Sequence, residues 1–188
     1  MATDYKVQRR TYDDVAMSAT NLRIRLGIEH CFSFNIVHQI RRMKGKEFGE
    51  LGSLDIHLFT GHGVPYVTFD PLVLHVDKEI WDEAELNEPM ARFMLAHELG
   101  HLVLHRYYRQ EFSASNEQHL KAFPAEERSE PQANWFAATF LAPDYLAIRC
   151  QNASELCMSF DYPREFAGLK QHLFQQWQGK NSIATPAP

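Results

Sequence analysis

One apolar segment of the chain, residues 93–105, carries three histidines and a glutamate. Within it, His97, Glu98 and His101 form the pattern H-E-x-x-H. Helical residues four apart lie on one face, one turn above each other, so the two imidazoles can bind the same zinc ion. Glu98 lies about 100° round the helix, where it can reach a water on that ion. The pattern therefore predicts a metal site on a helix, with Glu98 as the catalytic group.

The residues around this pattern are almost wholly apolar, which indicates a helix that is buried on most of its sides. We expect this helix to run from about Glu88 to His105, with Asn87 as its N-cap and Pro89 in its first turn. Buried polar groups must be paired or bound, because an unsatisfied one costs roughly 2–7 kcal/mol. A purely structural role, in which backbone or water satisfies these groups without a metal, is the alternative.

A catalytic zinc site needs a third protein ligand. We expect Glu130, because it opens a second helix whose small residues permit close approach to another helix. Asn134 lies one turn further along the same face and can accept a hydrogen bond from the outer nitrogen of a ligating histidine. The predicted cofactor is one zinc ion per chain, held by His97, His101 and Glu130. The alternative third ligands are Glu126, Glu127 and His105.

The rest of the sequence predicts a mixed α and β architecture. The expected helices are residues 12–26, 34–43, 88–105, 130–141 and 164–178. The expected strands are residues 54–58, 64–69 and 72–76. Short turns join these strands, which indicates a small, mostly antiparallel sheet. We take residues 72–76 as the edge strand on which a peptide substrate would add.

The length of the chain, 188 residues, is typical of one domain. We expect a single domain over residues 1–178, followed by a disordered tail at residues 179–188. Within the domain, residues 1–50 form an N-terminal helical part, residues 51–143 the metal-site core, and residues 144–178 a C-terminal helical part.

Charge and cysteine content argue against several classes of protein. The formal net charge is −5, whereas general nucleic-acid binders usually carry a basic footprint. The basic residues at 41–46 lie at the end of an expected helix, where cations suit the helix dipole. The three cysteines fit neither a disulfide framework nor a C-x-x-C metal site. Without an evident signal peptide or membrane span, we expect a cytoplasmic protein that binds neither membranes nor nucleic acid directly.

The two helices of the predicted metal site resemble those of the ImmA/IrrE family of zinc metallopeptidases. The resemblance is carried by residues 92–105, 130–138 and 141–143. It implies a zincin-like α+β domain of the gluzincin type, in which a helix after H-E-x-x-H supplies a glutamate ligand. It also implies cleavage of a partner transcriptional repressor, which switches on stress or mobile-element genes. Gln132 departs from the family, in which an acidic residue often precedes Ala-Asn.

These observations together predict a zinc-dependent endopeptidase. Glu98 takes the proton of the attacking water and later passes it to the leaving amine. Candidate donors to the oxyanion are Tyr107, Tyr108 and His119. The polar connection at residues 107–129 can cover the cleft, so we expect restricted specificity toward one partner, a helix-turn-helix repressor. A catalytically latent or degenerate module that only binds its partner is the alternative.

Overall fold

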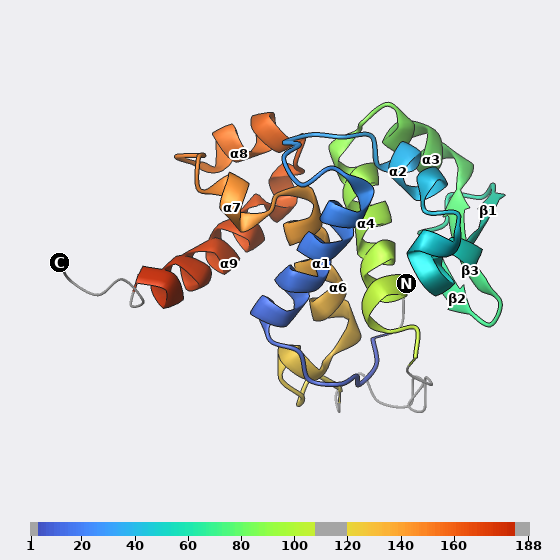
Figure 1. The fold of residues 1–188 in the computed structure, drawn as a ribbon, viewed down its shortest axis with the longest axis horizontal. Helices are drawn as coiled ribbons and strands as arrows, with labels where there is room; N and C mark the ends of the chain where they lie inside the picture. Colours follow the sequence, from blue (N-terminus) through green and yellow to red (C-terminus); the bar gives the residue numbers. More distant parts are fainter. Residues whose placement is uncertain (1–3, 108–119, 183–188) are drawn as a thin grey trace.

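The computed structural model describes residues 4–107 and 120–182, which form an α+β architecture arranged around one buried helix, α4 (Figure 1). The helices are α1 (Tyr12–Leu26), α2 (Ile36–Arg42), α3 (Lys78–Glu85), α4 (Pro89–Leu104), α6 (Ser129–Leu141), α7 (Asp144–Ala147), α8 (Ala153–Phe160) and α9 (Arg164–Ser182). The strands are β1 (Asp55–Phe59), β2 (Tyr66–Phe69) and β3 (Leu72–Asp77), and two 3-10 segments are η1 (Lys46–Ser53) and η2 (Ala125–Glu127). The expected α+β class is confirmed.

Helix α4 is buried over most of its surface, as its apolar sequence indicates. It begins after Glu88, whose side chain accepts a hydrogen bond from the Ala91 amide at 2.7 Å. Asn87, the expected N-cap, has a φ of 64°, a left-handed conformation that asparagine tolerates better than most residues. The predicted N-cap was therefore wrong by one residue, because the chain turns at Asn87 before the helix begins.

Helix α6 packs directly against α4, and a glycine within the H-E-x-x-H segment allows this approach. A Cβ atom on Gly100 would lie 3.0 Å from the Cα atom of Ala133 and 3.1 Å from the Cβ atom of Phe136, closer than ordinary Cβ contacts. Ala133 and Ala137 are fully buried, so the expected close approach through small residues of the second helix is confirmed. Helix α1 packs against α6 as well (Figure 1).

The sheet is mixed, with the strand order β1-β3-β2. Strand β2 pairs with β3 in antiparallel orientation, whereas β1 pairs with β3 in parallel. The expectation of a mostly antiparallel sheet was therefore only half right, and residues 72–76 form the centre of the sheet rather than an edge. The two-residue turn at 70–71 forces β2 and β3 into a hairpin, while the longer connection at 60–65 lets β1 pair on the other side of β3.

The C-terminal part is helical, and its last helix is longer than expected. Helix α9 continues to Ser182, so residues 179–182 of the expected tail are helical and residues 183–188 lie outside the described part of the chain. No helix among the described residues is both long and apolar enough to cross a membrane.

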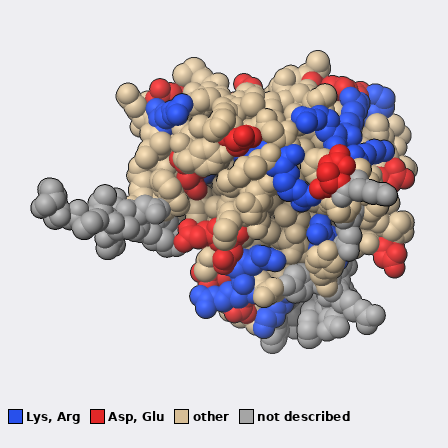
Figure 2. Space-filling model, in the orientation of Figure 1, with Lys and Arg blue, Asp and Glu red and all other residues tan. Residues whose placement is uncertain are grey.

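The basic residues at the end of α2 make contacts within the protein. Arg41 pairs with Glu85 at 2.5 Å, and Arg42 donates hydrogen bonds to the carbonyl of Leu26 and to Gln39. On the face shown in Figure 2, basic and acidic side chains lie close to one another rather than in one basic patch. Arg41 and Arg42 of the basic cluster therefore contact other parts of the protein.

Candidate metal centre

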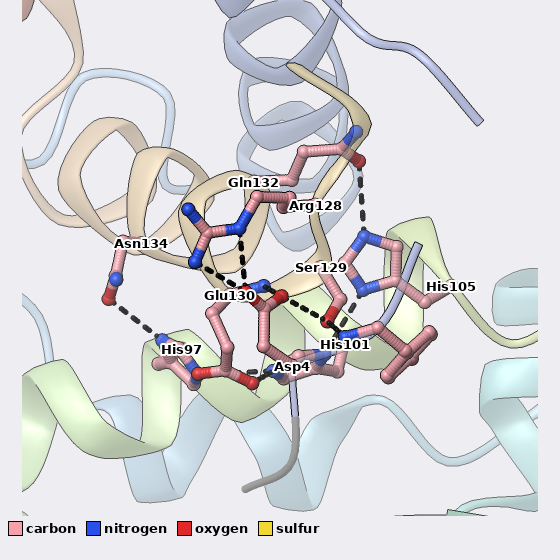
Figure 3. Close-up of polar contacts among 10 residues, drawn as sticks. Asp4, His97, His101, His105, Arg128, Ser129, Glu130, Gln132 and Asn134 are labelled. Carbon is pink, nitrogen blue, oxygen red and sulfur yellow. Dashed lines mark hydrogen bonds and ion pairs between the residues drawn. The ribbon is translucent and has the colours of Figure 1, made fainter. Parts of the chain in front are cut away.

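The three expected metal ligands meet at the contact between α4 and α6 (Figure 3). His97 and His101 lie one turn apart on α4, and Glu130 comes from the first turn of α6. The two Nε2 atoms are 3.1 Å apart. Oε2 of Glu130 lies 3.2 Å from Nε2 of His97, and Oε1 of Glu130 lies 3.2 Å from Nε2 of His101. The fold thus brings a side chain of α6 to two side chains of α4.

The separations between these nitrogen and oxygen atoms are close to those expected around a tetrahedral metal ion. Ligands at about 2.0–2.1 Å from a tetrahedral zinc ion are about 3.3–3.4 Å from one another. The observed separations of 3.1 and 3.2 Å are close to that value. The Oε1 atom of Glu130 is buried and makes no hydrogen bond within the described part of the chain. Two imidazoles and one carboxylate are a donor set that zinc binds well, so the residues fit such an ion.

The outer nitrogen of His97 is held by the residue that the sequence indicates. Its Nδ1 atom lies 3.0 Å from the Oδ1 atom of Asn134, which can only accept a hydrogen bond. A neutral His97 therefore carries its proton on Nδ1 and directs the lone pair of Nε2 toward Glu130. An imidazole lone pair and a carboxylate oxygen repel each other at 3.2 Å unless a cation lies between them. The site consequently favours a cation, either a proton or a metal ion.

The pKa values of the cluster agree with this interpretation. Burial by itself would lower the pKa of His97, but the hydrogen bond and charge of Glu130, with Glu98 and Asn134, raise it above its ordinary value. Burial opposes ionisation of Glu130, yet the contacts with His101 and His97 lower its pKa to about 2. At neutral pH an ionised carboxylate therefore faces an imidazole that accepts a proton readily. A metal ion that bound here would therefore compete with a proton for the same place.

Glu98 lies next to the triad but contributes no atom to it. Its side chain is 4% exposed. Burial, opposed by His97 and assisted by the charge of Glu130, raises the pKa of this carboxyl to about 8. A carboxyl whose pKa is close to neutral pH is suited to taking up a proton and returning it.

A pocket of about 310 Å³ opens beside the triad. Its polar side is formed by His97, Glu98, Glu130 and Asn134. Its apolar side is formed by Val64, Pro65, Met90, Phe93, Met94 and Phe166. Residues 64–65 lead directly into β2, which is an edge strand of the sheet. The pocket therefore places an apolar surface and a sheet edge next to the candidate metal ligands.

The alternative third ligands lie elsewhere. Glu126 and Glu127, on η2, pair with Arg9 at 2.6 Å and with Lys6 at 3.6 Å. His105 is fully buried, and its Nδ1 atom lies 3.0 Å from that of His101, on the side away from the triad. Burial, followed by the neighbouring His101, lowers the pKa of His105 to about 3, so this imidazole is neutral. Four residues were considered as the third ligand. Among the described residues, Glu130 is the one of these four that lies with His97 and His101.

Of the three expected donors to an oxyanion, only Tyr107 belongs to the described part of the chain. Tyr107 is 69% exposed at the end of α4, and Tyr108 and His119 lie outside the described residues. Tyr5 was not among the expected site residues. It is 6% exposed and stacks on the His101 ring with 6.5 Å between ring centroids. Its hydroxyl is buried and has no hydrogen-bond partner within the described part of the chain. Burial, then the charges of Glu130, Glu98 and Asp4, raise the pKa of Tyr5, so the hydroxyl keeps its proton.

Asp4, in the segment before α1, holds the first turn of the helix that carries Glu130. Its Oδ1 atom accepts hydrogen bonds from the Glu130 amide and the Ser129 hydroxyl, both at 3.1 Å, and its Oδ2 atom accepts one from Arg128 at 2.7 Å (Figure 3). Asp4 therefore caps α6 from a distant part of the chain, as a carboxylate at a helix N-terminus commonly does. The separation of more than 120 residues leaves no signal of this contact in the sequence.

Comparison with known protein families places the chain in a peptidase family. The model of the IrrE N-terminal-like domain, a peptidase family, matches residues 53–168, which is more than half of the 188 residues. The chain belongs to this family. The expected resemblance to the ImmA/IrrE metallopeptidases is thereby confirmed. A comparison with curated proteins found no match. The region matched to the IrrE N-terminal-like domain includes α4 and α6, whereas Asp4, Tyr5 and the rest of the segment before α1 lie outside it.

Proposed function

We propose that this protein is a zinc-dependent endopeptidase that cleaves a partner protein. The observation that carries the proposal is the convergence of His97, His101 and Glu130 on a place that favours a cation, with the buried Glu98 beside it. The membership of a peptidase family supports the same reaction. We propose His97, His101 and Glu130 as the ligands of one zinc ion per chain.

The residues around the triad can perform peptide hydrolysis. A zinc ion bound in such a site would lower the pKa of the attacking water and polarise the scissile carbonyl. Glu98 takes the proton from that water and passes it to the leaving amine, in the two roles of general base and general acid. Asn134 keeps the His97 ring oriented through its 3.0 Å contact with Nδ1.

We propose the hydroxyl of Tyr5 as the donor to the oxyanion. It is a protonated donor without a partner among the described residues, and the charges that act on it belong to Glu130, Glu98 and Asp4. A substrate carbonyl that enters the site would give this hydroxyl the acceptor that it lacks. Preorganised donors of this kind commonly contribute about 10²–10³-fold to the rate.

The substrate would bind as an extended peptide along β2. This strand is an edge of the sheet, and the residues just before it line the pocket. Addition of a strand to an exposed edge is a common mode of peptide recognition. The apolar side of the pocket favours an apolar side chain next to the scissile bond. These features replace the earlier assignment of β3 as the receiving edge.

The proposed partner is a helix-turn-helix repressor, cut at an exposed loop by an enzyme of restricted specificity. This part of the proposal depends on the family, because the connection expected to cover the cleft lies mostly at residues 108–119, outside the described part. We also propose a cytoplasmic location, which the free thiols of Cys31, Cys150 and Cys157 support. The shared core of α1 to α9 supports a single domain over residues 1–178.

The test of this function separates metal binding from chemistry. The variant Glu98→Gln is expected to retain zinc and fold while its hydrolysis falls by about 10²–10⁴-fold or more, because it lacks the proton acceptor. Glu127→Gln is a matched control, since Glu127 pairs with Lys6 away from the triad. Loss of zinc in Glu98→Gln would show that Glu98 is a ligand, and the mechanism would then be wrong.

The substrate is tested with the wild-type protein and zinc. The assay compares casein with the helix-turn-helix repressor encoded nearest to the gene of this protein. We expect one or a few cuts in the repressor and little cleavage of casein. Rapid digestion of casein at many sites would contradict restricted specificity, and a zinc-loaded protein that cuts neither would favour the latent binding module.

A further inference from the structure

The two candidate histidine ligands differ in what holds their outer nitrogen. The Nδ1 atom of His97 faces the oxygen of Asn134, which can only accept a hydrogen bond. The Nδ1 atom of His101 instead faces the Nδ1 atom of His105 at 3.0 Å. An imidazole nitrogen can be a donor or an acceptor, depending on the tautomer. The contact with His105 therefore fixes the proton of His101 only if something else fixes the proton of His105.

Gln132 supplies that constraint. Its amide nitrogen Nε2 lies 2.9 Å from the carbonyl oxygen of Gln8 and 2.7 Å from that of Glu126. Both carbonyls can only accept, so the NH₂ group of Gln132 must face them and its oxygen Oε1 must face the other way. That oxygen lies 3.1 Å from the Nε2 atom of His105 (Figure 3). The orientation of the amide is thus set by two backbone groups.

The constraint passes along the chain of hydrogen bonds to the metal site. Because Oε1 of Gln132 only accepts, His105 must carry its proton on Nε2. The Nδ1 atom of the neutral His105 then has a lone pair and accepts a hydrogen bond. His101 must therefore carry its own proton on Nδ1, which leaves the lone pair of its Nε2 atom directed at Glu130, 3.2 Å away.

Because Gln132, His105 and His101 are buried, they depend on one another for most of their hydrogen-bond partners. Gln132 and His105 are both fully buried, and His101 is 3% exposed. With both histidines neutral, any other arrangement of protons along Gln132, His105 and His101 would leave a buried lone pair facing a lone pair at one of these two contacts, at a cost of about 1–3 kcal/mol for each unsatisfied group. The partners of His105 in the chain are an amide and an imidazole, which are neutral and offer no counter-charge for an imidazolium.

We propose that Gln132 and His105 are positioning residues that hold His101 in the tautomer able to bind a metal ion. This inference depends on the proposed metal site and extends it to the segment before α1, because the Gln8 carbonyl belongs to that segment. Gln132 is the residue at which the chain departs from the family pattern. Its side chain is neutral, with an NH₂ group that donates and an oxygen that accepts. It can therefore hold two carbonyls and one imidazole nitrogen at the same time.

The direct test measures the tautomer in the metal-free wild-type protein. Nitrogen-15 NMR of the histidine rings near pH 7 distinguishes a protonated ring nitrogen from one with a lone pair. We expect His101 and His105 to be protonated on opposite atoms, Nδ1 in His101 and Nε2 in His105. A proton on Nε2 of His101 would overturn the proposal, whether or not the protein binds zinc.

A variant then links the tautomer to metal affinity. Gln132→Met keeps a similar volume but lacks the amide, so the proton on His105 is no longer fixed. We expect mixed tautomers at His101 and a zinc affinity that is about 10-fold to 100-fold weaker, the usual effect of losing an outer partner. Gln39→Met is a matched control, because Gln39 is a buried glutamine on α2 that contacts Arg42 instead.

The possible failures can be told apart. A Gln132→Met protein that keeps one tautomer and wild-type zinc affinity would overturn the role of Gln132. If Gln132→Met does not fold, the tautomer measured in the wild type still decides the proposal. If the wild-type protein takes up no zinc at all, the proposed function fails, and with it the purpose assigned to this hydrogen-bond chain.

Discussion

Two clusters of buried charged groups border helix α6, and they differ in whether they are complete. Near the end of α6, Lys170 is fully buried and lies 2.7 Å from Asp144. The other oxygen of Asp144 accepts a hydrogen bond from Tyr12 at 2.8 Å, and Tyr12 also contacts Thr139 of α6. In this network, one positive and one negative side chain neutralise each other, and the polar neighbours complete their hydrogen bonds.

The cluster near the start of α6 has no such internal balance. The carboxylate of Glu130 faces the Nε2 atoms of His97 and His101, and one of its oxygens makes no hydrogen bond to the described residues. The network of Lys170 joins α1, α7 and α9 and therefore stabilises the fold. The triad lacks a positive charge of its own and is suited to receive one from solution. Burial is therefore common to both clusters, and the missing counter-charge is what makes the triad a candidate metal site.

The largest expected effect on stability comes from removing the cation of the complete network. Lys170→Met should lower the free energy of unfolding by about 3–5 kcal/mol, because Asp144 is then left buried without its counter-charge. Zinc affinity should not change, since the network does not touch the triad. Denaturant unfolding of the metal-free protein measures the loss.

The double variant Lys170→Met with Asp144→Asn serves as the control. Removing both charges should recover part of the lost stability, because no unpaired charge remains. If the single variant is as stable as the wild type, the network does not have the structural role assigned to it.

The next effect concerns the hydroxyl beside the incomplete cluster. Tyr5→Phe should slow peptide hydrolysis by about 10²-fold without weakening zinc binding, because only the proposed oxyanion donor is lost. Tyr162→Phe removes another buried hydroxyl that makes no hydrogen bond within the described residues, and it should leave the rate unchanged. Equal rates for Tyr5→Phe and the wild type would exclude Tyr5 from the reaction.

The smallest expected effect is the pH dependence of zinc affinity. His97 must be neutral to bind a metal ion, and the surroundings raise its pKa above the ordinary value. Zinc affinity should therefore be highest above that raised pKa, where His97 is neutral. It should decrease as the pH falls through the pKa, by up to about tenfold per pH unit for one displaced proton. Zinc titrations between pH 6 and pH 8 measure this change. An affinity that stays constant over that range would argue against competition between a proton and the metal ion.

Much of the local structure could be predicted from the sequence because its signals are local. Helix α1 has the predicted bounds, since Thr11 caps its start and Gly27, with a φ of 68°, ends it. The faces of α4 follow from the helical period, which places His97 and His101 together. Glu130 and Asn134 were found in the same way, one turn apart on α6.

The remainder depends on contacts between distant residues. β3 is central because β1 pairs with it on the side opposite β2. The alternation of apolar residues within a strand does not determine which neighbour that strand pairs with. Helix α3 was not predicted, although Asp77 caps it and Trp81 is buried in the core. Asp4 and Tyr5 reach the site across more than 120 residues of sequence, through hydrogen bonds to Ser129 that no local pattern announces.

The central claim is that the incomplete cluster binds one zinc ion. The most direct measurement is the zinc content of the wild-type protein and of Glu130→Gln after dialysis against zinc, with thermal unfolding recorded in parallel. We expect one zinc per wild-type chain and a higher melting temperature with zinc than without it, and we expect both effects to be lost in Glu130→Gln. A wild-type protein that takes up no zinc, or a Glu130→Gln protein that remains fully loaded, would contradict the account.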